Sequence, residues 1–442
     1  MEEVTVFDHP VSIAGPVCWQ NLEQFAREQL QGFIQRLLEE EVAALLGRQK
    51  SERRAVGTPP AVPGEGAATA GEEGAAPPAP VYRNGYGKPR RLATSSGTLT
   101  LRRPRVRGLA ERFESRILPL FQRRTEAVGK LLPELYLHGL STGDFDLALR
   151  GLLGEGAPLS PSSILRLKAS WQQEYEAWKG RSLAEEPVVY LWVDGIYVKA
   201  GLEKEKAALL VAIGALADGR KVVLAVEPGQ RESTESWGAI LRKLKAQGLG
   251  CPRLVIGDGN LGIWGALANV FPEAAEQRCW NHRQVNILDK IGKKQQPTAK
   301  VWLRQVMYAE TRERAVELKG KFQTWCQKSG CADAGRLLDE DWDRLVAYYD
   351  FPLEHWKHLR TTNPVESPFA AVRLRTTAAK RYKRADHATA VIWKTLLIAE
   401  QRFRRVDAPE KMPLVAAGIT YRNGQRTHCL QELMREVREV AA

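Results

Sequence analysis

Apolar side chains recur at nearly helical spacing from residue 19 to residue 46, and Gly47 follows them. A repeat near 3.6 residues places such side chains on one face of a helix, and glycine often follows a helix end. The pattern predicts an amphipathic helix whose apolar face packs in an N-terminal domain, with self-association through that face as the alternative. Residues 51–81 are mostly Ala, Pro, Gly and Glu, which predicts a flexible linker.

Continuous apolar runs mark the segment from residue 187 to residue 257. These runs predict four strands, at 188–193, 207–215, 222–226 and 254–256. A helix is predicted between the third and the fourth strand, at 233–247. Three strands that lead into an alternating helix and strand indicate an α/β domain with a mixed sheet. From Leu288 to His358 the pattern becomes helical, which predicts an all-helical subdomain with its tryptophans in the core.

A helical region precedes the predicted sheet. Ser141-Thr142-Gly143-Asp144 resembles a capping box that opens one helix, and Ser160-Pro161 opens a second one, so a helix-turn-helix is predicted. The second helix carries one apolar stripe that is expected to be buried: Ile164, Leu167, Trp171, Tyr175 and Trp178. Its early polar face is the part expected to meet DNA: Ser162, Ser163 and Arg166.

Positive charge is concentrated in one stretch of the 442 residues. The whole chain has 65 Lys and Arg against 52 Asp and Glu, a net charge of +13, and most of the excess falls between Arg83 and Thr125. Around Gly97 the residues alternate as in an exposed strand, which predicts a basic β-hairpin or ribbon. So many cations indicate a polyanionic partner, because phosphate contacts release counterions. The arginines expected to contact DNA are Arg102, Arg103, Arg105 and Arg107.

Two features bear on the compartment. The chain begins with acidic residues and has no apolar run near the roughly 18 residues of a membrane span, which disfavours secretion and membrane insertion. The six cysteines include no C-x-x-C pair that would start a structural zinc site. We therefore expect a cytoplasmic, nucleoid-associated protein with no membrane partner.

Two predicted strands end in Asp-Gly, at Asp194 and at Asp258. Carboxylates at the ends of buried strands, each beside a glycine, indicate a metal site, with ordinary Asp-Gly turns as the alternative. Glu366 lies in the first turn of a helix that Asn363-Pro364 opens, where a carboxylate is favoured and where it is also a routine capping residue. This helix is expected to run on through Phe369, Val372 and Leu374. The basic residues that follow Glu366 are expected to grip a phosphodiester backbone: Arg373, Arg375, Lys380, Arg381, Lys383 and Arg384.

Four motifs occur in a fixed order along the chain. They are Val193-Asp194-Gly195, Gly257-Asp258-Gly259-Asn260-Leu261, the segment from Gln277 to His282, and the segment from Thr361 to Ser367. Together they resemble bacterial insertion-sequence transposases of the Mutator-related family. The resemblance implies a ribonuclease H-like catalytic core with an all-helical insertion between the second aspartate and the glutamate.

By matching position, the resemblance makes Asp194, Asp258 and Glu366 a DDE triad. Three such carboxylates hold two Mg²⁺ ions in enzymes that displace a phosphate oxygen in line, and Mn²⁺ is expected to substitute. The Cys-x-x-His of the family falls on Cys279 and His282, for which we expect a supporting role at the active site in preference to zinc binding. Asn363 is the third supporting residue.

The leading hypothesis is a DNA transposase that binds the ends of its own element and performs metal-dependent strand cleavage and strand transfer. Its expected partners are double-stranded DNA, as terminal inverted repeats and as target, and a second copy in a homodimer. One alternative is a catalytically silent DNA-binding regulator derived from a transposase, which the three carboxylates disfavour. The other is a ribonuclease H-fold nuclease, which the basic and helix-turn-helix regions disfavour.

These interpretations divide the chain into eight regions. The first four are an N-terminal helical region at 1–50, the linker at 51–81, the basic β-ribbon at 82–126 and the helix-turn-helix-like region at 127–186. The last four are the first part of the core at 187–287, the all-helical insertion at 288–358, the second part of the core at 359–410 and a tail at 411–442.

Overall fold

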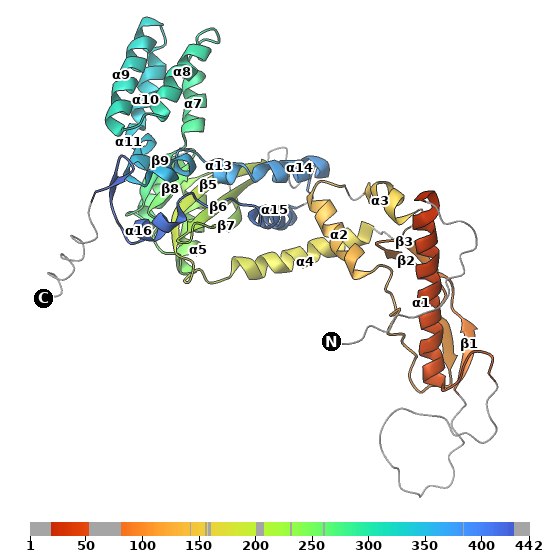
Figure 1. Cartoon of the computed structure of the whole chain (residues 1–442). Coiled ribbons are helices and arrows are strands. Elements are labelled where there is room, and N and C mark those ends of the chain that lie inside the picture. The colour runs from red at the N-terminus through yellow and green to blue at the C-terminus, as the bar shows by residue number, and fades with distance from the viewer. Residues whose placement is uncertain are drawn as a thin grey trace, which may run out of the picture. The chain divides into compact units, whose positions relative to one another are not determined.

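The computed structural model describes most of the chain (Figure 1). The described residues are 19–52, 81–141, 143–154, 157, 161–199, 207–229, 232–259, 261–382 and 384–427. The predicted linker lies outside them except for its ends. The chain forms two compact units: an N-terminal unit of residues 1–135 and 141–164, and a sheet unit of residues 136–140 and 165–442. None of the described helices combines the length and the apolar character needed to cross a lipid bilayer.

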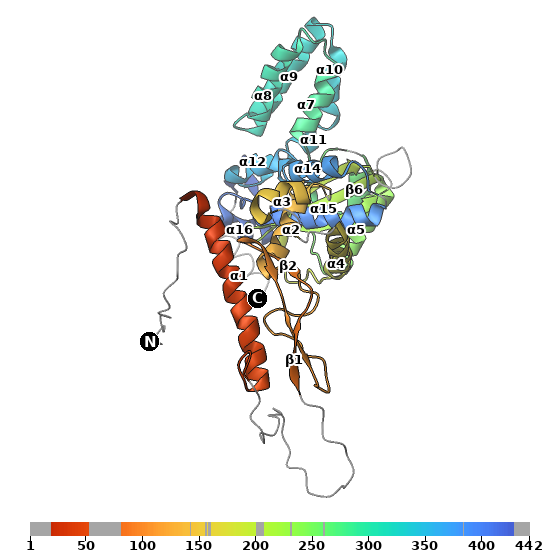
Figure 2. The ribbon, with the colours of Figure 1, turned by 90° about the vertical axis from the view of Figure 1, so that its right-hand side faces the viewer.

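In the N-terminal unit one long helix, α1 (Leu22–Leu46), runs beside short antiparallel strands (Figure 2). β1 pairs with β4 and β2 with β3; their bounds are β1 (Tyr82–Tyr86), β2 (Arg90–Thr94), β3 (Gly97–Leu101) and β4 (Pro104–Arg107). The predicted helix and basic hairpin are therefore confirmed. The prediction of an exposed strand is wrong for one face, because Leu99 and Leu101 are buried against Leu38 of α1.

Three helices follow the ribbon: α2 (Glu126–Leu137), α3 (Phe145–Leu153) and α4 (Pro161–Lys179). The predicted capping box does not form. Ser141 Oγ donates to Asp144 Oδ2 at 2.6 Å, and Asp144 makes no side-chain bond to the helix that begins after it. The α4 helix begins at Pro161, as predicted.

The later part of α4 packs in the sheet unit. Trp171 and Tyr175 are buried, and the Tyr175 hydroxyl donates to Val226 O at 2.8 Å. The ring of Trp178 lies 5.6 Å from that of Trp393. The later residues of the predicted apolar stripe thus pack in the sheet unit, whereas its first residue, Ile164, belongs to the N-terminal unit. The predicted region 127–186 contributes to both units.

The sheet unit is built on a five-stranded mixed sheet in the order β7-β6-β5-β8-β9. The strands β5, β6 and β7 are antiparallel neighbours, and β8 and β9 run parallel to β5. Their bounds are β5 (Val188–Val198), β6 (Ala207–Leu216), β7 (Lys221–Gly229), β8 (Leu254–Gly257) and β9 (Ala275–Arg278). The predicted mixed α/β sheet is therefore confirmed.

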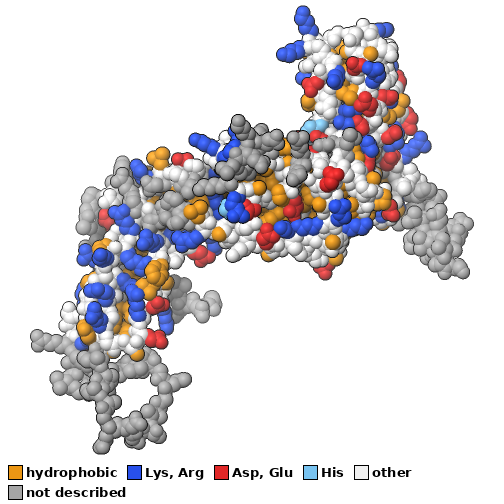
Figure 3. Space-filling view, turned by 180° about the vertical axis from the view of Figure 1, so that it is seen from behind, with side chains coloured by type: hydrophobic (Ala, Val, Ile, Leu, Met, Phe, Trp, Pro, Cys, Tyr) orange, Lys and Arg blue, Asp and Glu red, His pale blue; other side chains and the backbone are white. Residues whose placement is uncertain are grey.

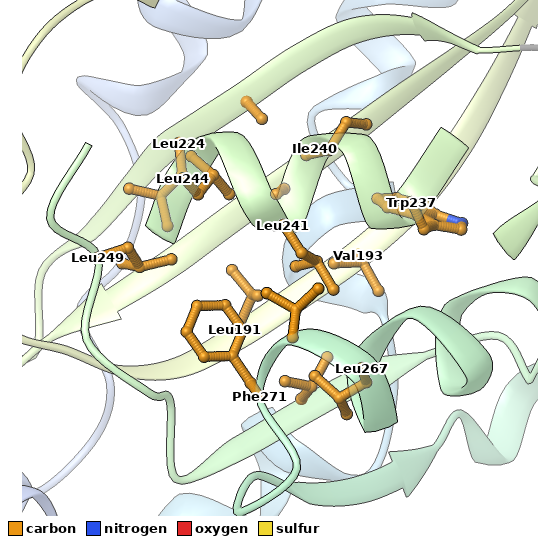
Figure 4. Close-up of a cluster of buried hydrophobic side chains, with 14 of the residues drawn as sticks. Leu191, Val193, Leu224, Trp237, Ile240, Leu241, Leu244, Leu249, Leu267 and Phe271 are labelled. Atoms are coloured by element: carbon orange, nitrogen blue, oxygen red, sulfur yellow. The ribbon is translucent and has the colours of Figure 1, made fainter. Parts of the chain in front are cut away.

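Two helices cover one face of this sheet, α5 (Thr234–Ala246) and α6 (Leu261–Val270). The Ser233 side chain caps α5 by accepting from Ser236 N, which explains why the helix starts where the sequence predicts. Figure 4 shows Leu191 and Val193 of β5 packed against Leu241 and Leu267 of the two helices. This apolar layer holds β5, the central strand, in place.

Helices fill the chain between β9 and residue 359, and α7 to α10 form a bundle (Figures 1 and 2). They are α7 (Trp280–Leu288), α8 (Gln296–Met307), α9 (Arg312–Lys328), α10 (Ala332–Glu340), α11 (Trp342–Leu345) and α12 (Trp356–Leu359). Of the four tryptophans predicted in its core, Trp356 is buried and the other three are half-buried.

The chain then returns to the sheet. The segment after Thr362 is two helices where the sequence predicts one, because Pro368 has no N–H to continue the first helix. The remaining elements are α13 (Asn363–Glu366), α14 (Phe369–Ala379), α15 (Ala385–Glu400), α16 (Met412–Ala416), β10 (Tyr421–Arg422) and β11 (Gln425–Arg426). Short 3₁₀ helices are η1 (Trp19–Asn21), η2 (Ala347–Asp350), η3 (Leu353–His355) and η4 (Pro409–Lys411).

Candidate acidic site at the strand ends

Asp194 and Asp258 come together because β5 and β8 are neighbouring parallel strands. Asp258 directly follows β8, as predicted, but Asp194 does not end its strand, because β5 continues to Val198 in its pairing with β6. Trp192 of β5 lies opposite Ile256 of β8, and each aspartate comes two residues further along its chain. Continued register places the two carboxylates at the same edge of the sheet. Gly259, next to Asp258, has a φ of +93°, and a Cβ there would lie 2.3 Å from Arg278 Nε. The glycine of this motif is therefore required by the turn.

Glu366 reaches the same edge from a distant part of the sequence. Its helix, α13, contacts β5 and β6. Thr362 Oγ1 donates a hydrogen bond to Glu366 Oε1, which orients the carboxylate. The charge of Glu366 raises the pKa of Asp194, so the two groups are close enough to interact. The structure thus brings the three predicted carboxylates to one place.

Cys279 and His282 connect this edge to Glu366. The backbone N of Cys279 donates to Gly257 O at 2.7 Å, and its buried Sγ accepts from Thr362 N at 3.3 Å. His282 Nδ1 lies 3.8 Å from Glu366 Oε1. Ligand atoms of Cys279, His282 and Glu366 all lie within 4.8 Å of one another, a spacing that a metal ion would accept. The thiol holds Thr362 in position, and Thr362 in turn orients Glu366.

A fourth carboxylate, Glu232, lies at the site and was not predicted from the sequence. Its residue is 9% exposed, and the Tyr197 hydroxyl donates to Glu232 Oε1 at 3.0 Å. A Cβ at Gly195 would lie 2.4 Å from the same oxygen, so the glycine beside Asp194 makes room for this carboxylate. The only local signal is its place just before the N-cap Ser233, which also suits an ordinary capping residue.

Burial and negative charge shape the ionisation of the site. Burial is the main cause that raises the pKa of Asp194 to about 7, and the charges of Glu232 and Glu366 add to it. The hydrogen bond to Cys279 chiefly raises the pKa of His282 to about 9, and the carboxylates of Asp258 and Glu366 add to it. His282 is then positively charged at neutral pH. The site thus combines carboxylate oxygens with one imidazolium, and carboxylate oxygens are ligands that divalent cations prefer.

The predicted DNA-contacting residues after Glu366 differ in exposure. Arg375 is 1% exposed, and its guanidinium donates to Tyr136 O at 2.6 Å and to Leu140 O at 2.8 Å. The prediction of a phosphate contact does not fit this residue, because its donors satisfy buried carbonyls. The exposed members of the set are Arg373, Lys380, Arg381 and Arg384, and Lys383 lies outside the described residues.

In the N-terminal unit the predicted DNA-binding arginines lie along and after the ribbon strands. Arg102, Arg105 and Arg107 are exposed, and Arg103 is half-buried. Figure 3 shows Lys and Arg side chains gathered on one face of this unit, at the lower left. On α4, Arg166 is exposed, and the side chains of Ser162 and Ser163 lie outside the described part. Asn363, exposed on α13, accepts a hydrogen bond from Asn281 Nδ2 at 3.0 Å.

The fold and the site define an α/β protein with carboxylates gathered around Asp194 of its central strand β5. A family model described as "Transposase, Mutator family" matches residues 67–402, which include all four of these carboxylates. The chain therefore belongs to the Mutator family of transposases.

Three relatives are named as transposases for insertion sequence elements. The chain is 44% identical to that of element IS6120 of Mycolicibacterium smegmatis, over 67% of this chain and 92% of the relative. It is 41% identical to that of IST2 of Acidithiobacillus ferrooxidans, over 63% of this chain and 94% of the relative. It is 32% identical to that of ISRM5 of Rhizobium meliloti, over 79% of this chain and 81% of the relative.

Proposed function

We propose that this protein is the transposase of an insertion sequence, and that it binds the ends of its own element and catalyses Mg²⁺-dependent DNA strand cleavage and strand transfer. The observation that carries the proposal is the convergence of Asp194, Asp258 and Glu366 at one edge of the sheet. Charged groups gathered in a partly buried site cost folding energy, so a functional role is the better explanation of the cluster.

The proposal includes a ribonuclease H-like core. Its support is the sheet order β7-β6-β5-β8-β9, in which three antiparallel strands are followed by two strands parallel to the first. The first and fourth strands along the chain supply the two aspartates, and a later helix supplies the glutamate. Helices α8 to α10 lie between the second aspartate and Glu366, where the family resemblance implies an insertion.

The donor set fits magnesium. Asp194, Asp258 and Glu366 offer only carboxylate oxygens, which Mg²⁺ prefers, and Mn²⁺ accepts the same ligands. Burial chiefly raises the pKa of Asp194 to about 7, with the charges of Glu232 and Glu366 adding to it, and a bound cation would favour its ionised form. When bound, such ions activate water or a 3′-hydroxyl and stabilise the leaving oxygen of the phosphate.

The protein's own groups orient and balance this site. The Thr362 hydroxyl donates to one oxygen of Glu366, and the Thr362 backbone N donates to the sulfur of Cys279, which holds Thr362 in position. The imidazolium of His282 lies beside the carboxylates and offers a positive charge to an approaching phosphate. The Gly195 N–H donates to Asp194 Oδ1 at 2.8 Å and holds that side chain against the strand.

DNA recognition is assigned to the N-terminal unit, whose arginines form the most basic stretch of the sequence. Binding through phosphates supplies affinity there, and groove contacts would supply sequence selectivity. Because an insertion element has two ends that must be processed together, we propose that a homodimer is the active form.

The test is cleavage and strand transfer on duplexes that carry the ends of the flanking element, with Mg²⁺ present or chelated. We expect Asp194→Asn, Asp258→Asn and Glu366→Gln each to lower cleavage by about 100-fold or more, because each removes a metal ligand. DNA affinity should stay within about twofold in all three variants, because no phosphate-binding cation is removed.

The matched control is Asp218→Asn, which changes an exposed aspartate of the same sheet that pairs with Arg220. It should cleave like the wild type. Substantial Mg²⁺-dependent cleavage by one of the three site variants would remove that residue from the triad. Specific binding without any cleavage by the wild type would favour the regulator alternative.

A further inference from the structure

A pocket of about 590 Å³ lies beside α13 in the sheet unit, apart from the acidic site. Residues Asn363, Pro364 and Ser367 form one wall of it, and the end of α15 with the segment after it forms another. The four carboxylates of the acidic site do not line it. A volume of this size is typical of sites that hold a small organic ligand or one unit of a polymer.

The charged side chains of the pocket wall are all basic. They come from separate parts of the chain: Lys221 begins β7, Lys357 lies on α12, and Arg402 and Arg404 follow α15. The wall residues, all of them described, include no aspartate or glutamate. The nearby Asp407 is engaged by Lys357 and lies 3.2 Å from His358 Nε2. The pocket is therefore suited to an anionic group.

Lys221 is the most deeply placed of these cations, at 9% exposure. Its Nζ donates to the carbonyl oxygen of Arg404 at 2.7 Å, and burial lowers its pKa to about 8. A neutral carbonyl compensates a buried ammonium only in part. An anion in the pocket would complete that compensation.

The wall also has apolar residues, among them one phenyl ring, beside the polar residues His138, His358, Asn363, Ser367 and Thr395. Leu137, Pro364, Pro368 and Ile398 contribute aliphatic surface, and Phe403 contributes a half-buried ring. Bases of nucleic acids stack on aromatic side chains whatever their identity, while their phosphates bind Lys and Arg. An unstacked nucleotide combines these two requirements, a flat apolar body and an anion.

The position of the pocket completes the inference. The short helix α13 carries Glu366 to the acidic site, and its residues Asn363 and Pro364 line the pocket. The pocket and the acidic site therefore share this one short helix. We infer that the pocket receives one unstacked nucleotide of the DNA strand held at the acidic site, with its base against Phe403 and its phosphate at Arg402, Arg404 and Lys221. This inference rests on the DNA-binding part of the proposed function and deepens it.

The test uses the full-length protein and element-end duplexes without divalent metal, so that binding is measured without cleavage. At each terminal position in turn, one duplex carries a mispaired base and a second carries an abasic nucleotide. A mispair removes part of the cost of unstacking, so at the position that enters the pocket it should tighten binding about tenfold. The abasic nucleotide should lose most of that gain, because no base is left to contact Phe403.

The variants assign that difference to the pocket. The difference in affinity between mispaired and abasic duplexes should disappear in Phe403→Leu. It should shrink in the double variant Arg402→Gln/Arg404→Gln. In that double variant the slope of log affinity against log salt should also flatten, by about 0.9 for each phosphate that is no longer neutralised. The matched control is Arg405→Gln, since Arg405 is exposed, adjacent in sequence and outside the pocket wall. It should behave like the wild type.

Three outcomes are decisive. Equal binding of mispaired and abasic duplexes at every position overturns the inference, and so does a difference that survives both pocket variants. Cleavage by a wild type that lacks this binding difference overturns the inference and leaves the proposed function standing. The binding difference in a protein that never cleaves supports the pocket and overturns the catalytic part of the proposed function.

Discussion

Glu232 is the residue whose importance only the folded chain reveals. It lies against Gly195 and accepts from Tyr197, so its charge acts directly on Asp194. We predict that Glu232→Gln lowers the cleavage rate by about 10- to 100-fold, as loss of a group that supports metal ligands commonly does. The amide oxygen can still accept from Tyr197, so the fold and the DNA affinity should be retained.

The control for the Glu232 variant is Glu235→Gln, which changes an exposed glutamate three residues later, in the first turn of α5. It should leave cleavage unchanged. Single-turnover cleavage at saturating DNA is the measurement, because it separates the chemical step from binding. A Glu232→Gln rate equal to that of the wild type would show that this carboxylate is structural.

Arg375 illustrates how burial changes the role of a basic residue. We predict that Arg375→Met lowers the free energy of unfolding by roughly 3 kcal/mol, because it leaves the carbonyls of Tyr136 and Leu140 without their donor. Arg373→Met, two residues earlier and exposed, should change it by less than about 0.5 kcal/mol. Urea unfolding of both variants is the measurement. Equal stability of the two would mean that water replaces the missing donor.

Among single residues, the sequence predicts those site residues that lie in short ordered motifs. Asp194, Asp258 and Glu366 belong to such motifs, and the structure places them together. Glu232 and the structural role of Arg375 were not predicted, because nothing local distinguishes them from a capping glutamate and a solvated arginine. Their roles depend on neighbours more than 30 residues away in the chain.

At the scale of helices and strands, the basic ribbon packs one face on α1, and its arginines Arg102, Arg105 and Arg107 are exposed. We predict that Arg102→Gln/Arg105→Gln/Arg107→Gln flattens the log–log salt dependence of binding to element ends by about 0.9 for each phosphate that these arginines neutralise. Fluorescence anisotropy over a salt series is the measurement. Arg103 is left out of this variant because it is half-buried.

The matched control for the ribbon is Arg314→Gln/Lys321→Gln on α9, where both cations already pair with Glu317. It should leave the slope unchanged. If the ribbon variant also keeps the wild-type slope, its arginines face solvent or protein when DNA is bound.

The success of element prediction follows from the strength of the local pattern. Four strands of the sheet, β5, β6, β7 and β8, are apolar runs that the sequence locates, although β5 extends to Val198. The fifth strand, β9, was not predicted, because its residues Ala275–Arg278 are short and mostly polar. The predicted helix that carries Glu366 is two helices, since Pro368 interrupts the backbone hydrogen bonds. One face of β3, which was predicted to be an exposed strand, is buried against α1. The sequence could not predict this, because an alternating pattern does not reveal which helix covers the apolar face.

In the molecule as a whole, the sheet unit includes residues that precede its first strand, at 136–140 and from residue 165 onward. Trp171 and Tyr175 of α4 are buried in the sheet unit, and the carbonyls of Tyr136 and Leu140 hold Arg375. A fragment that begins at residue 181 would lack all four of these residues.

We predict that removal of residues 1–135 leaves a cooperatively unfolding protein, whereas removal of residues 1–180 does not. Thermal unfolding followed by circular dichroism compares the two fragments. The first fragment should bind DNA weakly and without preference, because the ribbon is missing. If it still prefers element ends about tenfold over scrambled duplexes, sequence readout belongs to the sheet unit.

The amino-acid sequence is sufficient to predict four of the five strands of the sheet, the long first helix, the basic ribbon and the motifs that carry three carboxylates. Each of these is written in neighbouring residues, as an apolar run, a helical repeat or a cluster of charge. Only the folded chain reveals which strands are neighbours, that Glu232 joins the site, that Arg375 is buried and that a basic pocket lies beside α13. These features depend on side chains brought together from distant parts of the chain, and no local pattern records which distant segments will pack against each other.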